Sequence, residues 1–176
     1  MANAEHGYMD LAIAQARIGR SEGGIPIGAV LAGPDGVLGL GHNRRVQSDN
    51  PILHAEMDAL ANAGRLSYTD YLSATMYTTL SPCSMCTGAV LLYRIPRVVI
   101  GENATFLGEE ELLRSRGVDV TVVDRTECTR LMQNFIAQYP TLWAEDIGEE
   151  TDSSKRTGAA SLIRASGCHP ASNCHG

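Results

Sequence analysis

Apolar residues recur along the chain with two different spacings. Apolar side chains three and four positions apart indicate helices, whereas short β-branched or apolar runs bounded by turn residues indicate strands. The first pattern predicts helices at Tyr8–Gly19, Leu53–Gly64, Ser81–Pro96, Gly108–Arg116 and Glu127–Tyr139. The second predicts strands at Ile27–Leu31, Val37–Gly41, Thr75–Leu80, Arg97–Gly101 and Val118–Val123.

Turn and capping residues refine this pattern. The sequence Gly33-Pro34-Asp35-Gly36 separates the first two strands and predicts a β-hairpin. Ser81 is expected to cap the third helix, with Pro82 in its first position. The order of elements predicts an α/β fold of three layers, α/β/α, with one mixed five-stranded sheet covered by helices on both faces. Right-handed crossovers would make the last strands parallel neighbours.

The composition changes after Glu150. Residues 151–176 are rich in Ser, Ala, Gly, Thr and Asn without apolar periodicity, so burial could not offset the entropy of ordering them. We therefore expect one folded domain at 1–150 and a flexible polar tail at 151–176. The tail contains Cys168-His169 and Cys174-His175, which could hold a metal ion, although no predicted element would preorganise them.

Charge and hydropathy restrict the possible partners. The net charge of −6 argues against nucleic acid, whose binding depends on Lys and Arg neutralising phosphates, and favours a small-molecule substrate. Residues 1–10 show no basic start followed by an apolar run, and no stretch approaches the roughly 20 apolar residues of a membrane span. The sequence therefore predicts a cytoplasmic protein that does not insert into a membrane.

Two short motifs carry candidate metal chemistry, His54-Ala55-Glu56 and Pro82-Cys83-Ser84-Met85-Cys86. Cysteines three apart share one helix face, and a helix start lowers thiol pKa values toward the thiolate that zinc requires. His54, Cys83 and Cys86 are thus candidate ligands of one zinc ion per chain. Three protein ligands leave the fourth tetrahedral position to water, as in catalytic zinc sites.

Glu56 is the candidate catalytic residue. Residues two apart in a helix point in nearly opposite directions, so His54 must sit at the helix cap if both side chains are to meet one water molecule. Glu56 would then act as base and acid in turn, and the combination of H-x-E with P-C-x-x-C is the signature of zinc deaminases. A structural zinc module and a thiol–disulfide pair are the alternatives. Neither has a use for Glu56 beside an open coordination position.

The sequence also resembles the cytidine deaminase superfamily, and within it the homodimeric fungal-type cytosine deaminases, from about Tyr8 to Glu149. The resemblance is carried by several stretches: Glu22-Gly23-Gly24-Ile25-Pro26-Ile27-Gly28, Gly41-His42-Asn43, Leu53-His54-Ala55-Glu56, Tyr77 to Ala89, Gly101-Glu102-Asn103 and Trp143 to Glu149. It implies a cytidine deaminase-like fold, a zinc-dependent deaminase domain at 1–150 and a homodimer.

The resemblance also implies polar contacts to a pyrimidine base. Asn43 and the backbone N–H of Ala55 would bind the O2 edge, because an amide can donate and accept there. The backbone carbonyl of Ser81 and the carboxylate of Asp146 would meet the exocyclic amine. Without the resemblance, Asn43 is equally consistent with a turn residue and Asp146 with a solvated charge at a chain end.

Two aromatic residues, Phe106 and Trp143, would by resemblance wall and cover the ring; the alternative is ordinary core packing. The close relatives carry aromatic residues where Val46 and Ala144 stand in this chain. Both positions are expected near the base, so the pocket should be wider and cytosines substituted at C5 should be accepted.

The leading hypothesis is hydrolysis of cytosine to uracil and ammonia, a reaction of pyrimidine salvage. The alternatives with the same chemistry are guanine, isocytosine or a related heterocycle as substrate. A tRNA adenosine deaminase is disfavoured by the acidic charge and by Trp143, which resembles a cover over a closed pocket. A non-catalytic zinc-stabilised interaction domain is the alternative from another class.

Overall fold

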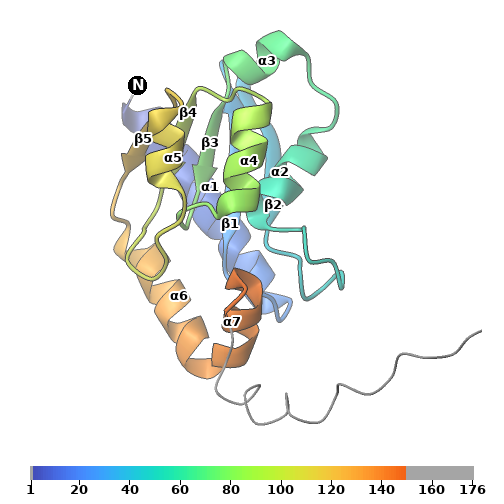
Figure 1. Cartoon of the computed structure of the whole chain (residues 1–176), viewed down its shortest axis with the longest axis vertical. Coiled ribbons are helices and arrows are strands. Elements are labelled where there is room, and N and C mark those ends of the chain that lie inside the picture. Colours follow the sequence, from blue (N-terminus) through green and yellow to red (C-terminus); the bar gives the residue numbers. More distant parts are fainter. Residues whose placement is uncertain (1, 150–176) are drawn as a thin grey trace, which may run out of the picture.

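Five strands form one mixed sheet, in the order β2-β1-β3-β4-β5, in the computed structural model, which describes residues 2–149 (Figure 1). The strands are β1 (Gly28–Gly33), β2 (Gly36–His42), β3 (Thr75–Thr78), β4 (Arg97–Ile100) and β5 (Asp119–Val122). Strand β1 is antiparallel to β2 and β3, whereas β3, β4 and β5 are parallel neighbours. The mixed sheet and the parallel pairing of the last strands confirm the prediction.

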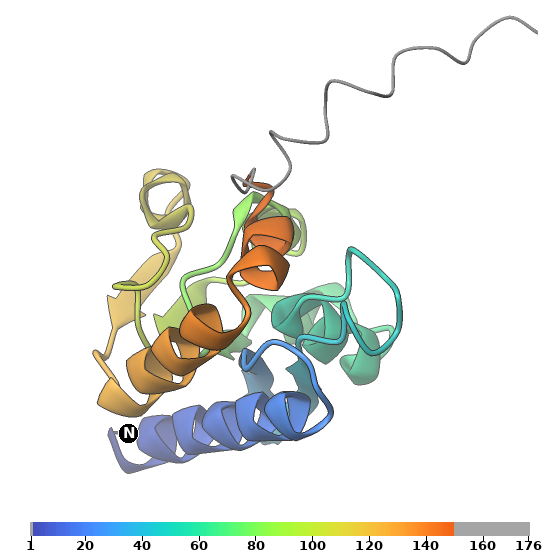
Figure 2. The same cartoon turned by 90° about the horizontal axis from the view of Figure 1, so that it is seen from below.

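Helices cover both faces of this sheet, as predicted. They are α1 (Ala2–Ser21), α2 (Ala55–Ala63), α3 (Tyr68–Leu72), α4 (Ser84–Leu92), α5 (Glu110–Ser115), α6 (Thr126–Gln138) and α7 (Pro140–Ile147). Helices α2, α4 and α5 lie on one face, and α1 lies on the other with α6 alongside it (Figures 1 and 2). Ion pairs from Arg17 to Glu127 and from Arg125 to Asp10 link α1 to α6.

The apolar side chains of β1 alternate between the two faces. Ala29 and Leu31 belong to the larger core cluster beneath α2, α4 and α5, whereas Val30 and Ala32 belong to a smaller cluster with α1. All four side chains are buried. A central strand buried on both faces appears in the sequence as a continuous apolar run, which is why β1 could be predicted.

The backbone of α2 packs directly on β2, at Gly39 and Gly41. A Cβ atom at Gly41 would lie 2.2 Å from the backbone nitrogen of Ala59 and 2.6 Å from the carbonyl oxygen of Ala55. Only glycine permits this approach. It brings the first turn of α2, and the histidine that precedes it, to the end of the sheet.

Gly41→Ala is expected to destabilise the protein by about 1–3 kcal/mol, because the overpacked helix must move away from the strand. Gly7→Ala in α1 is the matched control, since a Cβ there would meet no atom of the described chain within 4 Å apart from its own helix. The control should be stabilising by up to about 1 kcal/mol. Urea denaturation measures both. Equal stability of Gly41→Ala and wild type would contradict the close packing.

The predicted cap of the third helix is wrong. Helix α4 begins at Ser84 and its N-cap is Cys83. The hydroxyl of Ser81 instead donates to the carboxylate of Glu110 at 2.9 Å and accepts from the backbone N–H of Gly108 at 3.0 Å. Ser81 is therefore occupied by a buried network before the helix starts.

Two helices were not predicted. Helix α3 has a capping box, in which Ser67 and Asp70 satisfy each other's backbone N–H, so its start could have been found in the sequence. Helix α7 starts at Pro140, a favourable first position. The expected tail at 151–176, with its Cys and His pairs, lies outside the described residues. Within the part of the chain that the structure describes, no helix is long and apolar enough to cross a membrane.

Candidate active site

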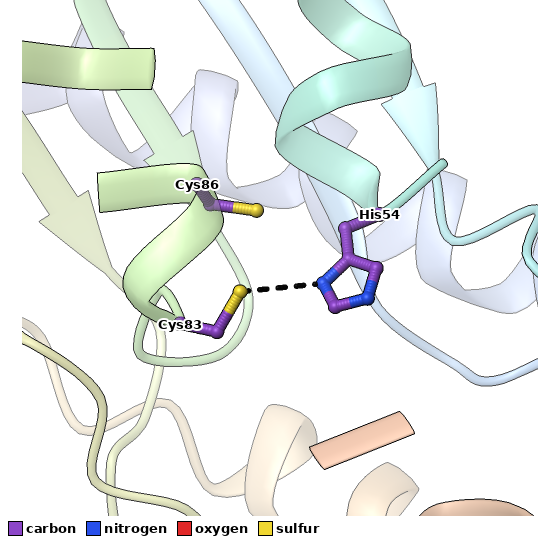
Figure 3. Close-up of side chains that lie close together, drawn as sticks. All are labelled: His54, Cys83 and Cys86. Carbon is purple, nitrogen blue, oxygen red and sulfur yellow. Dashed lines mark hydrogen bonds between the residues drawn. The ribbon is translucent and has the colours of Figure 1, made fainter. Parts of the chain in front are cut away.

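Three potential metal ligands meet at the starts of two helices, α2 and α4. His54 is the N-cap of α2 and Cys83 the N-cap of α4, and both have extended backbone conformations. Cys86 follows in the first turn of α4. Figure 3 shows the three side chains turned toward one another, with the Cys83 Sγ atom 3.5 Å from the His54 Nδ1 atom. The ligand atoms of all three lie within 4.8 Å of one another, so they could hold a metal ion.

The donor set and its spacing fit zinc. With Zn–S bonds of about 2.3 Å and Zn–N bonds of about 2.0–2.1 Å, neighbouring ligand atoms of a tetrahedral site lie about 3.5–3.8 Å apart. One imidazole and two thiolates are ligands that zinc prefers. Because the protein supplies three ligands, one tetrahedral position is left for water, which is the arrangement of catalytic sites.

Of the three ligands, Cys83 already favours its metal-binding thiolate form, whereas Cys86, whose pKa is raised by its hydrogen bond with Cys83 and by burial, and His54 must each lose a proton when a metal binds. A hydrogen bond from Cys86 and the neighbouring His54 lower the pKa of the Cys83 thiol to about 4, although burial opposes this. Burial would lower the pKa of His54, but the hydrogen bond with Cys83 and the charge of Asp146 outweigh burial and raise the pKa to about 9. The site thus favours a Cys83 thiolate beside a protonated His54. A divalent cation can displace the imidazole proton and supply the positive charge in its place.

Glu56 lies in the first turn of α2 and is buried. Its Oε1 atom accepts a hydrogen bond from the Thr78 hydroxyl at 2.8 Å. Burial, followed by the charge of Cys83, raises the pKa of this carboxyl group. A raised pKa suits a group that must both take and release a proton near neutrality. His54 at the cap and Glu56 two residues later line the same pocket, as the sequence required.

The pocket beside the candidate ligands is small. Its cavity volume of about 20 Å³ holds about one water molecule. It is lined by Ile27, His54, Ala55, Glu56, Leu80, Ser81, Cys83, Phe106, Trp143, Asp146 and Ile147. The rings of Phe106 and Trp143 meet edge to face with centroids 5.9 Å apart, and Trp143 is only 7% exposed. These rings cover part of the site, whereas His54 and Cys83 are only partly buried and also line an open surface hollow of about 410 Å³.

Five of the six expected substrate contacts line this pocket, namely Ala55, Ser81, Phe106, Trp143 and Asp146. Asn43 does not line it. Its amide nitrogen lies 3.3 and 3.4 Å from the carboxylate oxygens of Asp146, and its side-chain oxygen accepts the backbone N–H of Arg45 at 3.1 Å. Asn43 is therefore buried against Asp146, which itself lies 3.6 Å from the His54 Nε2 atom.

The expected widening of the pocket at Val46 and Ala144 is wrong. Val46 is 39% exposed and lines a separate surface hollow together with Leu142 and Glu145. Ala144 is buried but is not among the residues that line the pocket, because neighbours in a helix point about 100° apart and Trp143 already faces inward. Neither position gives a structural reason for accepting cytosines substituted at C5.

A buried carboxylate, Glu110, supports the pocket and was not singled out from the sequence. It accepts hydrogen bonds from Ser81 at 2.9 Å and from Asn103 at 3.1 Å, so it fixes one wall. Glu102 accepts from the backbone N–H groups of Ala104 and Thr105, immediately before Phe106. The sequence signal for this support is the stretch Gly101-Glu102-Asn103, which carries part of the family resemblance, whereas nothing in the sequence distinguished Glu110 from the other acidic residues of its helix.

An open N,S,S ligand set beside a buried carboxylate, at one end of a mixed sheet, defines a zinc hydrolase of the deaminase class. The family profile described as the cytidine and deoxycytidylate deaminase zinc-binding region matches residues 2–102. The chain belongs to this family, and its domain is a zinc-binding one.

Individual relatives add detail. The chain is 55% identical over 142 residues to the cytosine deaminase of Candida albicans, covering 80% of this chain and 95% of that one. It is 30% identical to a tRNA-specific adenosine deaminase of Buchnera aphidicola, covering 76% and 95% of the two chains. A solved structure from work on A-to-I editing by tRNA:A34 deaminases superposes with a TM-score of 0.62 at 27% identity, covering 72% of this chain and 99% of that one. The expected α/β deaminase fold is thereby confirmed.

Proposed function

We propose that this protein is a zinc-dependent hydrolase that converts cytosine and water to uracil and ammonia. The observation that carries the proposal is the 55% identity to the Candida albicans cytosine deaminase, over 95% of that protein. The small cavity flanked by Phe106 and Trp143 supports a substrate as small as a free base. The net charge of −6 supports the same choice against tRNA.

His54, Cys83 and Cys86 would hold the zinc ion, which lowers the pKa of water toward neutrality when bound. The chain's own residues do the rest. Glu56, oriented by Thr78, takes a proton from the attacking water as its oxygen bonds to C4, and delivers that proton to the ring nitrogen N3. It then transfers the proton of the hydroxyl now on C4 to the departing amine, which leaves as ammonia while the carbonyl of uracil forms.

The pocket walls position the base. The carbonyl of Ser81 and the carboxylate of Asp146 accept hydrogen bonds from the exocyclic amine, and the N–H of Ala55 donates to the O2 edge. Asn43 either binds the O2 edge itself or holds the Asp146 carboxylate in place through its hydrogen bond. Phe106 and Trp143 hold the ring and exclude bulk water, which strengthens every electrostatic contact inside the pocket.

Ammonia release from a panel of bases tests this function. Zinc-loaded protein is incubated with cytosine, cytidine, guanine, adenine and isocytosine under identical conditions. Cytosine should have the highest kcat/KM, and cytidine should fail because a ribose on N1 removes the N–H that Asn43 could accept and would press on Trp143. A purine turned over faster than cytosine would replace the proposed substrate, and release from none would favour a non-catalytic zinc domain.

The homodimer implied by the resemblance is also a proposal. It is supported by exposed apolar side chains at the end of α4, where Leu92 is 74% and Tyr93 40% exposed. Large exposed apolar side chains in one place mark interaction surfaces. Sedimentation should give the mass of two chains for the wild type and of one chain for Leu92→Asp. A monomeric wild type would contradict the proposal.

A single domain at 1–150 and a dispensable tail remain proposals as well. A chain that ends at Glu150 should keep the melting temperature and the turnover per site of the full chain. Loss of a second zinc ion on truncation would instead assign a metal to the Cys and His pairs of the tail.

The free thiols of Cys83, Cys86 and Cys128 support the expected cytoplasmic location, because a reducing compartment keeps thiols available.

A further inference from the structure

Three residues form a closed set of contacts between the loop after β2 and helix α7. The Asn43 amide donates to Asp146, and the Arg45 backbone N–H donates to Asn43. The Arg45 guanidinium completes the set, with its Nε atom 3.8 Å from Asp146 and its Nη1 atom 3.7 Å from Glu145. Arg45 thus contacts two successive residues of α7 with its side chain and fixes the asparagine with its backbone.

Burial makes the contact to Asp146 stronger than a surface ion pair. The side chain of Asp146 is 3% exposed and that of Arg45 is 22% exposed, whereas Glu145 is 55% exposed. A buried carboxylate needs hydrogen bonds and a nearby positive charge. Asn43 supplies the hydrogen bonds and Arg45 supplies a permanent charge, because guanidinium does not deprotonate in proteins.

Helix α7 is the element that this contact holds in place. It contributes Trp143, Asp146 and Ile147 to the pocket. The cavity of about 20 Å³ beneath α7 has room for about one water molecule and not for a pyrimidine, so α7 or the loop bearing Phe106 must shift for a base to enter it from the adjoining surface hollow. Within residues 2–149, the side-chain hydrogen bonds and ion pairs from α7 to the rest of the chain go to Asn43, Arg45 and His54. Of these, Arg45 alone is neither a metal ligand nor a proposed contact to the base.

We propose that Arg45 is a positioning residue that fastens α7 over the pocket through Asp146 and Glu145. Arg45 sets the fraction of protein molecules in which α7 covers the pocket. It also places the Asp146 carboxylate against the site, without itself touching the reacting atoms. This role deepens the proposed function and rests on it for its kinetic consequence. Its structural consequence, the position of α7, can be measured without turnover.

Arg45→Ala in the zinc-loaded full chain tests the proposal. KM for cytosine should rise about tenfold, as expected when a partly buried ion pair is lost, while kcat stays within about threefold of wild type. Trp143 is the only tryptophan of the chain, so quenching of its fluorescence by acrylamide reports the exposure of α7. The quenching constant should rise about twofold as the helix opens more often. Arg45→Lys, which keeps the charge, should recover most of both effects.

Arg44→Ala is the matched control. Arg44 is the adjacent residue with the same charge, but its guanidinium lies 3.7 Å from Asp58 of α2, and its side chain is 44% exposed. Its removal should leave KM and quenching at the wild-type values. If Arg45→Ala lowers the melting temperature too far for assay, Arg45→Gln removes the charge while retaining most of the packing.

The outcomes separate the two proposals. Unchanged quenching in Arg45→Ala overturns the fastening role, whether or not KM rises. A fall in kcat with unchanged KM overturns it too, because that result assigns Arg45 to the chemical step. If the wild type releases no ammonia from cytosine, the proposed function fails, and the quenching comparison alone decides the role of Arg45.

Discussion

Glu56→Gln is expected to lower kcat for cytosine about a thousandfold while zinc content and melting temperature stay at the wild-type values. General acid–base catalysis typically contributes about 10²–10⁴-fold. Glutamine keeps the shape of the side chain and can still accept the hydrogen bond from Thr78, which is 2.8 Å long in the wild type. It cannot carry a proton from water to the base. Steady-state kinetics, metal analysis and thermal denaturation on one preparation test all three expectations.

Glu111→Gln serves as the control for removal of a carboxylate. Glu111 lies in the first turn of α5, and its side chain is exposed. It should keep wild-type kinetics. If Glu56→Gln loses zinc together with activity, Glu56 holds the metal site together and the assigned proton transfer is wrong. If kcat falls less than tenfold, another group moves the proton.

Cys86→Ser should abolish both zinc binding and turnover. Cys86 is 1% exposed, so a metal that loses this ligand finds no water to take its place without rearrangement. A serine hydroxyl is a poor zinc ligand because it stays protonated at neutral pH, whereas a coordinating thiol is deprotonated. The melting temperature should also fall, because a metal that binds only the folded chain stabilises it by mass action. Metal analysis, calorimetry and ammonia release measure the three effects.

Cys128→Ser is the matched control, because Cys128 is also 1% exposed but packs in the cluster between the sheet and α1. Burial raises the pKa of its thiol to about 12, so it stays protonated and does not compete for metal. This variant should keep its zinc and its turnover. A Cys86→Ser protein with full zinc content would mean that the ion binds elsewhere, and the ligand set would need revision.

Much of the fold could be predicted because the relevant signals are local. Strand β1 is a continuous apolar run and β3, at the centre of the sheet, is a short β-prone run, and Gly64 with its positive φ of 70° ends α2 where the sequence places the end. Helix α3 has only five residues, so no apolar spacing can repeat in it. Helix α7 begins directly after Tyr139, where the predicted helix that precedes it ends, and the sequence analysis assigned no further helix there. Helix α1 begins at Ala2 rather than at the predicted Tyr8. This earlier start could not be predicted, because the sequence before Tyr8 shows little apolar periodicity.

The candidate site divides in the same way. The metal ligands are specified by short motifs at helix starts, and the expected cap position of His54 is confirmed. The contacts among Asn43, Arg45 and Asp146 join residues about a hundred positions apart, so no spacing in the sequence could reveal them. The prediction that Val46 lies near the base is wrong for a related reason. Its loop has no periodicity from which the direction of a side chain could be inferred.

Both helices that supply metal ligands begin without the usual capping hydrogen bond. Within the described chain, neither His54 nor Cys83 makes a side-chain capping hydrogen bond at the start of the helix that follows it. Ser, Thr, Asp or Asn at such positions typically stabilises a helix by about 1 kcal/mol, and His and Cys forgo that contribution. A capping substitution such as Cys83→Ser would supply that contribution to the metal-free chain but would remove a zinc ligand, together with the stabilisation that bound metal provides. Among the described residues, helices α5, α6 and α7 also begin without a side-chain capping hydrogen bond, so a capping residue could be introduced there without replacing a metal ligand.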